Sequence, residues 1–266
     1  MSQNNTILSD TDKTKIPYNP ETERLDKINE RLSLISLKKG LTFGTDSYLL
    51  AAFARGRESA VCAELGGGTG VVSLLCAARK KYKKIYCAEI QPYFADLIER
   101  NACLNSLNDS IEAINTDIRN LSVASVGGEV YSVISNPPYM SVSQGRENLS
   151  PEMSAARREE NGGLDDFTSA AARLLKFGGY FTVVYRPDRL SELLCSMSAH
   201  KIEPKRLVTV YPTASDKPCL VLVEGKKGAS PGLVVSRPLI IAKDRCGEYT
   251  EAMQAVYDTF SLEHLF

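Results

Sequence analysis

Residues 60–78 read Ala-Val-Cys-Ala-Glu-Leu-Gly-Gly-Gly-Thr-Gly-Val-Val-Ser-Leu-Leu-Cys-Ala-Ala, and this stretch decides the fold. The short apolar run at 60–65 predicts a buried strand, and the apolar run at 71–78 predicts a helix. Between them lies a glycine-rich turn at 66–70. A strand, a glycine turn and a helix form the geometry of a nucleotide-type cofactor site, because bare backbone lets a ligand approach closely.

Strands and helices alternate on either side of this stretch, which predicts a doubly wound, Rossmann-like α/β fold. The sheet is expected to have seven mostly parallel strands, with the last two antiparallel to each other. The expected strands cover residues 60–65, 84–90, 110–114, 130–135, 180–185, 205–210 and 219–224. The expected helices cover residues 70–81, 91–104, 164–175, 187–199 and 247–260.

The segment before the glycine turn is expected to add a small extension. Residues 24–28 suggest a short helix or turn, and residues 32–37 suggest a strand that pairs back with 41–43 as a hairpin. A helix over 47–55 follows, with Thr45 or Asp46 as its N-terminal cap.

Polar residues follow the ends of the first four predicted strands. They are the glycine turn itself, Glu89, Asp117 and Asn136. Ligands of doubly wound sheets bind at the carboxyl ends of the strands, so we expect these residues to share one site.

Asn136-Pro137-Pro138-Tyr139 is the most distinctive of these strand ends. Two consecutive prolines fix two φ angles and remove two N–H donors, which makes a rigid elbow. Asn136 Oδ1 and the Pro137 carbonyl can each accept one hydrogen of a planar group's NH2, while Tyr139 stacks on its ring. The plain alternative is a proline turn that ends a strand.

The composition is that of an ordinary globular protein, with 43% hydrophobic and 24% charged residues in 266. No run of about 18 apolar residues or signal peptide is present, so we expect a cytoplasmic protein without a membrane span. The seven cysteines form no Cys-x-x-Cys pair and the two histidines are isolated, so we expect no metal. The zero net charge argues against a uniformly basic nucleic-acid binder but leaves room for a local basic patch.

The glycine turn does not match the rival nucleotide sites. A dinucleotide site needs Gly-x-Gly-x-x-Gly, and Val71 stands where the third glycine belongs. The phosphate-binding loop Gly-x-x-x-x-Gly-Lys-Ser/Thr is not present either.

The pattern Glu64-x-Gly66-x-Gly68-x-Gly70 resembles motif I of the class I S-adenosylmethionine-dependent methyltransferases. The resemblance implies that Glu89 binds the ribose of the cofactor and that Asp117 accepts from the adenine amine. The implied cofactor is S-adenosylmethionine. The implied cofactor-binding residues are Glu64, Gly66, Gly68, Gly70, Glu89, Asp117 and Asn136, and the implied catalytic residues are Asn136, Pro137 and Tyr139.

The flanking sequence is similar to one amino-methyltransferase family, the bacterial tRNA1(Val) adenine-N6 methyltransferases. The similar segments are Glu23 to Asp26, the run Phe43-Gly44-Thr45-Asp46-Ser47-Tyr48-Leu49-Leu50-Ala51, and Gly247 to Glu251. This resemblance implies methylation of the N6 amine of an adenine beside the anticodon, with the anticodon loop of tRNA as the partner. Methylation of a release-factor glutamine or of ribosomal RNA guanine-N2, or a non-catalytic RNA-binding role, remain alternatives.

These expectations divide the chain into four parts. Residues 1–20 are a disordered tail, and residues 21–58 form a hairpin and helix packed on the core. Residues 59–226 form the S-adenosylmethionine-binding core, and residues 227–266 form a C-terminal extension. The sequence leaves the oligomeric state open.

Overall fold

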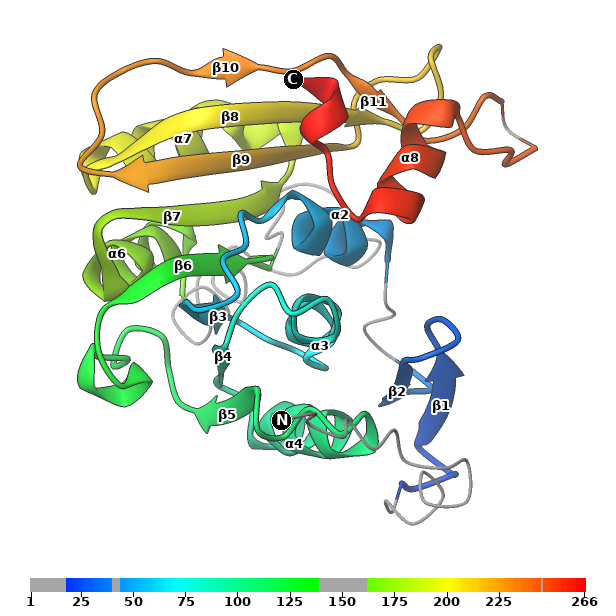
Figure 1. Cartoon of the computed structure of the whole chain (residues 1–266), viewed down its shortest axis with the longest axis vertical. Coiled ribbons are helices and arrows are strands. Elements are labelled where there is room, and N and C mark those ends of the chain that lie inside the picture. The colour runs from blue at the N-terminus through cyan, green and yellow to red at the C-terminus, as the bar shows by residue number, and fades with distance from the viewer. Residues whose placement is uncertain (1–17, 40–43, 139–161, 245) are drawn as a thin grey trace, which may run out of the picture.

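The computed structural model describes residues 18–39, 44–138, 162–244 and 246–266 (Figure 1). All seven predicted strands lie in one sheet, in the order β8-β9-β7-β6-β3-β4-β5. Neighbouring strands run parallel except that β9 is antiparallel to both β7 and β8. The strands are β3 (Val61–Leu65), β4 (Lys84–Glu89), β5 (Ile111–Asn115), β6 (Val130–Ser135), β7 (Leu175–Tyr185), β8 (Ile202–Tyr211) and β9 (Leu220–Lys227).

The described residues extend this sheet to nine strands. The two-residue strands β10 (Val234–Val235) and β11 (Leu239–Ile240) pair in parallel with β8. The alternation of helices and strands with a mostly parallel sheet confirms the doubly wound α/β fold.

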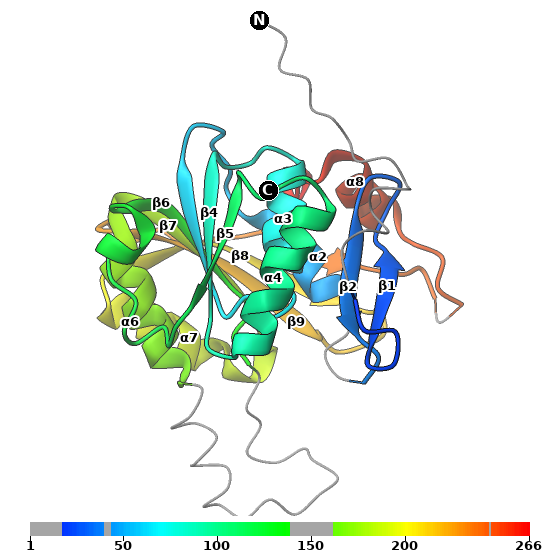
Figure 2. The same cartoon turned by 90° about the horizontal axis from the view of Figure 1, so that it is seen from below.

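Helices cover both faces of the sheet, as Figure 2 shows. One apolar cluster joins the sheet to α2 (Thr45–Phe53), α3 (Val71–Ala78), α4 (Pro92–Leu104) and α8 (Glu251–Thr259). A second cluster joins the opposite face to α6 (Leu164–Leu174) and α7 (Leu190–Ala199). Burial on both faces explains why the central strands read as apolar runs without alternation. Three short 3-10 helices complete the described chain: η1 (Ala124–Val126), η2 (Pro187–Arg189) and η3 (Glu263–Leu265).

The N-terminal extension differs from the prediction. The helix or turn expected at 24–28 is wrong, because β1 (Glu23–Lys27) pairs antiparallel with β2 (Ser33–Leu37). The hairpin partner expected at 41–43 lies outside the described residues. Tertiary packing explains the strand. Asn101 of α4 and Asn105, the C-cap residue of α4, each bond to backbone groups of β2, and Arg100 forms an ion pair with buried Glu23.

The start of β7 and the N-cap of α2 also differ from the prediction. β7 begins at Leu175, where a helix end was expected, and its pairing with β6 shifts register between Val130 and Ser132. The N-cap of α2 is Gly44, so the expected side-chain cap by Thr45 or Asp46 is wrong.

The C-terminal end of α2 is held by Lys81, which comes from the segment after α3. Its Nζ donates to the carbonyls of Ala51, Ala52 and Ala54 at 2.7, 2.9 and 2.7 Å. The last carbonyls of a helix carry partial negative charge and lack partners inside the helix, so an ammonium group is a fitting cap. Burial lowers the pKa of Lys81. None of the described helices combines the length and apolarity that crossing a membrane requires.

Replacing this cap tests how α2 is anchored. Lys81→Met keeps the aliphatic stem but leaves three carbonyls without the ammonium, so we expect the free energy of unfolding to fall by about 2–3 kcal/mol. Urea denaturation measures the loss, with the exposed neighbour change Lys80→Met as the control. Equal stability of the two variants would show that Lys81 does not anchor the helix.

Candidate functional site

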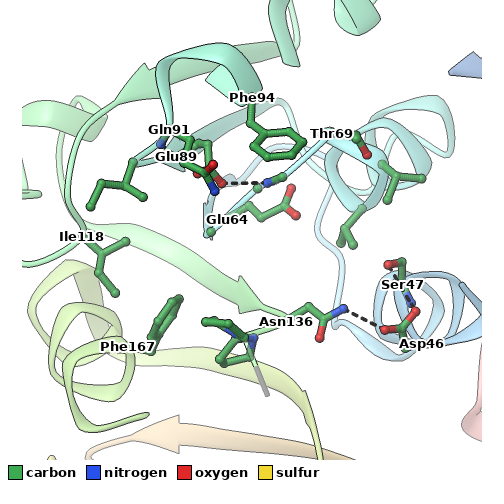
Figure 3. Close-up of a pocket in the computed structure, with 18 of the residues that line it drawn as sticks. Asp46, Ser47, Glu64, Thr69, Glu89, Gln91, Phe94, Ile118, Asn136 and Phe167 are labelled. Atoms are coloured by element: carbon green, nitrogen blue, oxygen red, sulfur yellow. Dashed lines mark hydrogen bonds between the residues drawn. The ribbon is translucent and has the colours of Figure 1, made fainter. Parts of the chain in front are cut away.

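A cavity of about 420 Å³ opens at the carboxyl ends of the parallel strands (Figure 3). This volume lies in the range of roughly 300–1,000 Å³ that is usual for small-molecule sites. The cavity is lined by Asp46, Ser47, Glu64, Gly66, Gly67, Gly68, Thr69, Val71, Val72, Glu89, Ile90, Gln91, Phe94, Asp117, Ile118, Asn136, Pro137, Pro138 and Phe167.

The glycine turn forms one wall, and most of its N–H groups already have partners. The N–H groups of Gly66 and Gly67 both donate to the Ala88 carbonyl, and that of Gly70 donates to Gly67. The Gly68 N–H donates to the Glu89 carboxylate at 2.9 Å. A phosphate-binding turn keeps such groups for the ligand, so this turn is built for a different one.

Two glycines of the turn have clear steric reasons. A Cβ on Gly67 would lie 2.2 Å from the Cys87 sulfur, so the turn packs directly onto β4. Gly68 has a φ of +54° and nothing within 4 Å of a Cβ, so its conformation rather than its packing favours glycine.

Glu89 ties the end of β4 to the turn. Its Oε2 accepts from Gly68, while its Oε1 accepts from the Gln91 N–H at 2.9 Å. The side chain lies in the cavity wall and is buried. Each carboxylate oxygen has a second lone pair, so Glu89 can still accept two ligand hydroxyls.

Glu64 is the most deeply buried carboxyl group of the wall. It accepts from the N–H and the hydroxyl of Ser73, and the Cys87 thiol donates to it at 3.4 Å. Burial raises its pKa to about 7, even though the Ser73 and Cys87 hydrogen bonds lower it. A positively charged ligand would favour the ionised form.

Asp117 follows β5 and reaches the same cavity. The Arg119 guanidinium bonds to both carboxylate oxygens, and this pairing lowers the pKa of Asp117. Asp117 is therefore held ionised as an acceptor at the cavity wall.

Asn136 directly follows β6, on the side of the cavity opposite Glu89. Its Nδ2 donates to Asp46 Oδ2 at 3.1 Å, a contact that Figure 3 shows between β6 and the first turn of α2. Pro137, which is buried, and exposed Pro138 continue the lining. Tyr139 lies outside the described residues, so its stacking role stays a prediction.

Most of the predicted site residues are brought together by the fold. Those lining the cavity are Glu64, Gly66, Gly68, Glu89, Asp117, Asn136 and Pro137. Gly70 lies outside the lining: it is the N-cap of α3, with a φ of 79°, and packs against Ile98.

Sequence reasoning missed several residues of the wall. Asp46 was interpreted only as a helix cap, although its carboxylate reaches Asn136. The apolar side chains of Phe94, Ile118 and Phe167 line the cavity between the polar groups. The position of Phe94, shortly after the acidic end of a strand, was the one available signal for these.

The charge of the cavity is one-sided. Its described lining carries four carboxyl groups (Asp46, Glu64, Glu89 and Asp117) and no Lys, Arg or His. Arg119, which lies outside the lining, pairs with Asp117, so the negative charge of the wall comes mainly from the other three carboxyl groups. This charge favours a cation over a pyrophosphate. Within the described ranges, no three His, Cys, Asp or Glu side chains are grouped so as to hold a metal ion.

The sequence has relatives with one shared name. Residues 51–143 match the model of the TRM5/TYW2 methyltransferase domain. A protein of Porphyromonas gingivalis named tRNA1(Val) (adenine(37)-N6)-methyltransferase is 29% identical over 188 residues, covering 68% of this chain and 72% of the relative. A protein of Shewanella loihica with the same name is 24% identical over 230 residues, covering 84% and 93%. These relatives confirm the resemblance inferred from the motifs.

Solved structures share the fold at lower sequence identity. A predicted O-methyltransferase from Agrobacterium tumefaciens superposes with a TM-score of 0.65 at 21% identity, covering 82% of this chain and 97% of that one. TYW2 of M. jannaschii, solved in complex with AdoMet, superposes with a TM-score of 0.53 at 17% identity, covering 79% and 88%. The fold is therefore that of the Rossmann-like methyltransferases.

The raised pKa of Glu64 predicts that ionising this group at higher pH lowers the free energy of unfolding of the ligand-free protein. The folded pKa of about 7 lies above the ordinary 4.5, so the folded state binds this proton more tightly than the unfolded state. Stability from this group is present below about pH 4.5 and lost as the pH rises to 7. We therefore expect Glu64→Gln to stabilise the ligand-free protein by about 2–3 kcal/mol at pH 8 and by little at pH 5.

Urea denaturation at both pH values measures this difference. If Glu64→Gln changed the free energy of unfolding equally at pH 5 and pH 8, the raised pKa of Glu64 would be contradicted. The surface change Glu99→Gln is the control for removing one carboxylate.

Proposed function

We propose that this chain transfers the methyl group of S-adenosylmethionine to the exocyclic N6 amine of an adenine in tRNA. The relatives named for this reaction and the methyltransferase fold support the reaction class. The observation that carries the proposal is the lining of the cavity. Its described wall is acidic, and it includes both the Asn136 side-chain amide and Pro137.

The charge of the wall suits this cofactor. S-adenosylmethionine carries a sulfonium, an ammonium and a single carboxylate group, so its net charge is positive, and it has no phosphate. Carboxylates in the wall therefore favour it over a dinucleotide, whose pyrophosphate is negative. Glu89 presents two acceptor oxygens to the ribose hydroxyls, and Asp117 accepts from the adenine amine. Gly66 and Gly68 let the cofactor lie close to the backbone, and Glu64 supplies negative charge beneath the turn.

Asn136 and Pro137 act on the methyl acceptor. The adenine amine is a poor nucleophile because its lone pair is delocalised into the ring. Asn136 Oδ1 and the Pro137 carbonyl each accept one amine hydrogen, which orients the lone pair and favours a pyramidal nitrogen. The bound cofactor supplies an electrophilic methyl group. The rate gain comes from positioning and fixed dipoles, and the amine proton leaves to water.

The tRNA substrate is proposed to be read at the purine beside the anticodon. Bases of a single-stranded loop unstack at low cost and can enter a pocket, where Tyr139 would stack on the adenine. The same grip on an NH2 group would also suit a glutamine amide or the guanine N2 amine. The cytoplasm remains the expected location.

A labelled-methyl assay tests the function. The purified protein receives methyl-labelled S-adenosylmethionine with unmodified tRNA, ribosomal RNA or release factor, and the products are digested and identified. We expect labelled N6-methyladenosine from tRNA. Label in glutamine or in N2-methylguanosine would replace the proposal with one of its alternatives, and no label in any substrate would overturn it.

The amide of Asn136 should matter for transfer more than for cofactor binding. Asn136→Ala removes one fixed acceptor, so we expect kcat to fall by an amount equal to about 2–4 kcal/mol in the barrier. Calorimetry should find cofactor affinity nearly unchanged. The exposed Asn108→Ala is the control, and near-normal turnover of Asn136→Ala would remove Asn136 from the mechanism.

Asp117, in contrast, should matter for cofactor binding more than for methyl transfer. Asp117→Ala removes an acceptor for the cofactor, so we expect its dissociation constant to rise about tenfold, the value of one lost hydrogen bond. Binding calorimetry with S-adenosylhomocysteine measures the change, and Asp109→Ala is the surface control. Unaltered affinity would exclude Asp117 from the cofactor site.

A further inference from the structure

We propose that Asp46 is a positioning residue that sets which end of the Asn136 amide faces the methyl acceptor. This inference rests on the proposed function and assigns a role to a residue that the sequence motifs left as a helix cap. Asp46 and Asn136 are 90 residues apart in the chain, yet Asn136 Nδ2 lies 3.1 Å from Asp46 Oδ2.

The Asp46 carboxylate is itself held in place. Its second oxygen, Oδ1, accepts from the backbone N–H of Ser47 at 2.7 Å, in the first turn of α2. Gly44 provides the room for this arrangement, because a Cβ at that position would lie 2.6 Å from Asp46 Oδ1. One oxygen therefore bonds to the helix and the other bonds to Asn136.

The helix that carries Asp46 is firmly anchored. Every residue of α2 from Ser47 to Phe53 is buried, and the helix packs against α3, β7 and β9. Lys81 bonds to the carbonyls at its other end. A residue at the start of such a helix can hold a partner with little loss of position.

The chemistry of a carboxylate makes the contact directional. An ionised carboxylate only accepts hydrogen bonds, whereas an amide has a donating NH2 and an accepting oxygen. Asn136 must therefore turn its NH2 to Asp46, which directs Oδ1 away from Asp46. In the reversed orientation, the Asn136 NH2 would meet the donating NH2 of the substrate, and the Asn136 oxygen would meet a carboxylate oxygen.

The charge of Asp46 adds a second effect. The acceptor nitrogen gains positive charge as its bond to the methyl group forms. A carboxylate one amide group away polarises the Asn136 carbonyl and favours that charge.

Two substitutions at Asp46 separate orientation from bulk structure. In Asp46→Asn the Ser47 N–H still needs the side-chain oxygen, so the new NH2 faces Asn136 and favours the reversed amide. Asp46→Ala removes the anchor without imposing the wrong orientation. We expect kcat on tRNA to fall about 100-fold in Asp46→Asn and about 10-fold in Asp46→Ala. A role in bulk structure would give the opposite order, because asparagine is the closer replacement.

A double-mutant cycle completes the test. In the Asn136→Ala background there is no amide to orient, so Asp46→Asn should change kcat less than threefold. Asp188→Asn, which removes a carboxylate from an exposed ion pair with Arg186, is the matched control. Calorimetry with S-adenosylhomocysteine should show that the cofactor dissociation constant of Asp46→Asn stays within threefold of the wild type.

Three results would overturn the role of Asp46. They are unchanged kcat in Asp46→Asn, an equal loss in the Asn136→Ala background, or a loss that lies wholly in cofactor affinity. The proposed function fails differently, because then the unaltered protein methylates no adenine in tRNA.

Discussion

The structure depends on carboxylates that converge where the parallel strands end. Asp46, Glu64, Glu89 and Asp117 come from four separate segments and line one cavity whose described wall has no cationic side chain. Glu89 also takes the Gly68 N–H that a phosphate-binding turn would offer to its ligand. Burial makes this arrangement costly, as the raised pKa of Glu64 shows. A cationic ligand without phosphates offsets that cost.

The fold holds the two sides of the cavity in a fixed relation. β3 and β4 support the glycine turn, and Asn101 of α4 bonds both to β2 and to the Thr69 carbonyl within that turn. On the other side, α2 is held in place by Lys81 and by its own buried contacts. Asp46 in the first turn of α2 bonds to Asn136, which follows β6. The turns and strand ends that carry the site residues are therefore held by rigid elements, which suits a reaction that relies on orientation instead of a strong base.

The sequence predicted what local pattern and chain order determine. Apolar runs located the central strands, and the parallel topology then placed Glu89, Asp117 and Asn136 at one edge. The strand β1 was missed because contacts with β2 and α4, not its own residues, stabilise it. Asp46 was underestimated for a similar reason: its partner is 90 residues away, and local rules favour a capping role at a helix start. Phe167 lines the cavity because of how α6 packs on the sheet. The apolar periodicity of the helix does not specify that packing.

A crystal structure of the protein with bound S-adenosylhomocysteine tests the proposed site most directly. We expect the ribose at Glu89, the adenine near Asp117, and the thioether sulfur facing Asn136 across a gap that admits a purine. A structure in which the Asn136 amide points away from the sulfur, or in which no base fits between them, would contradict the proposed site.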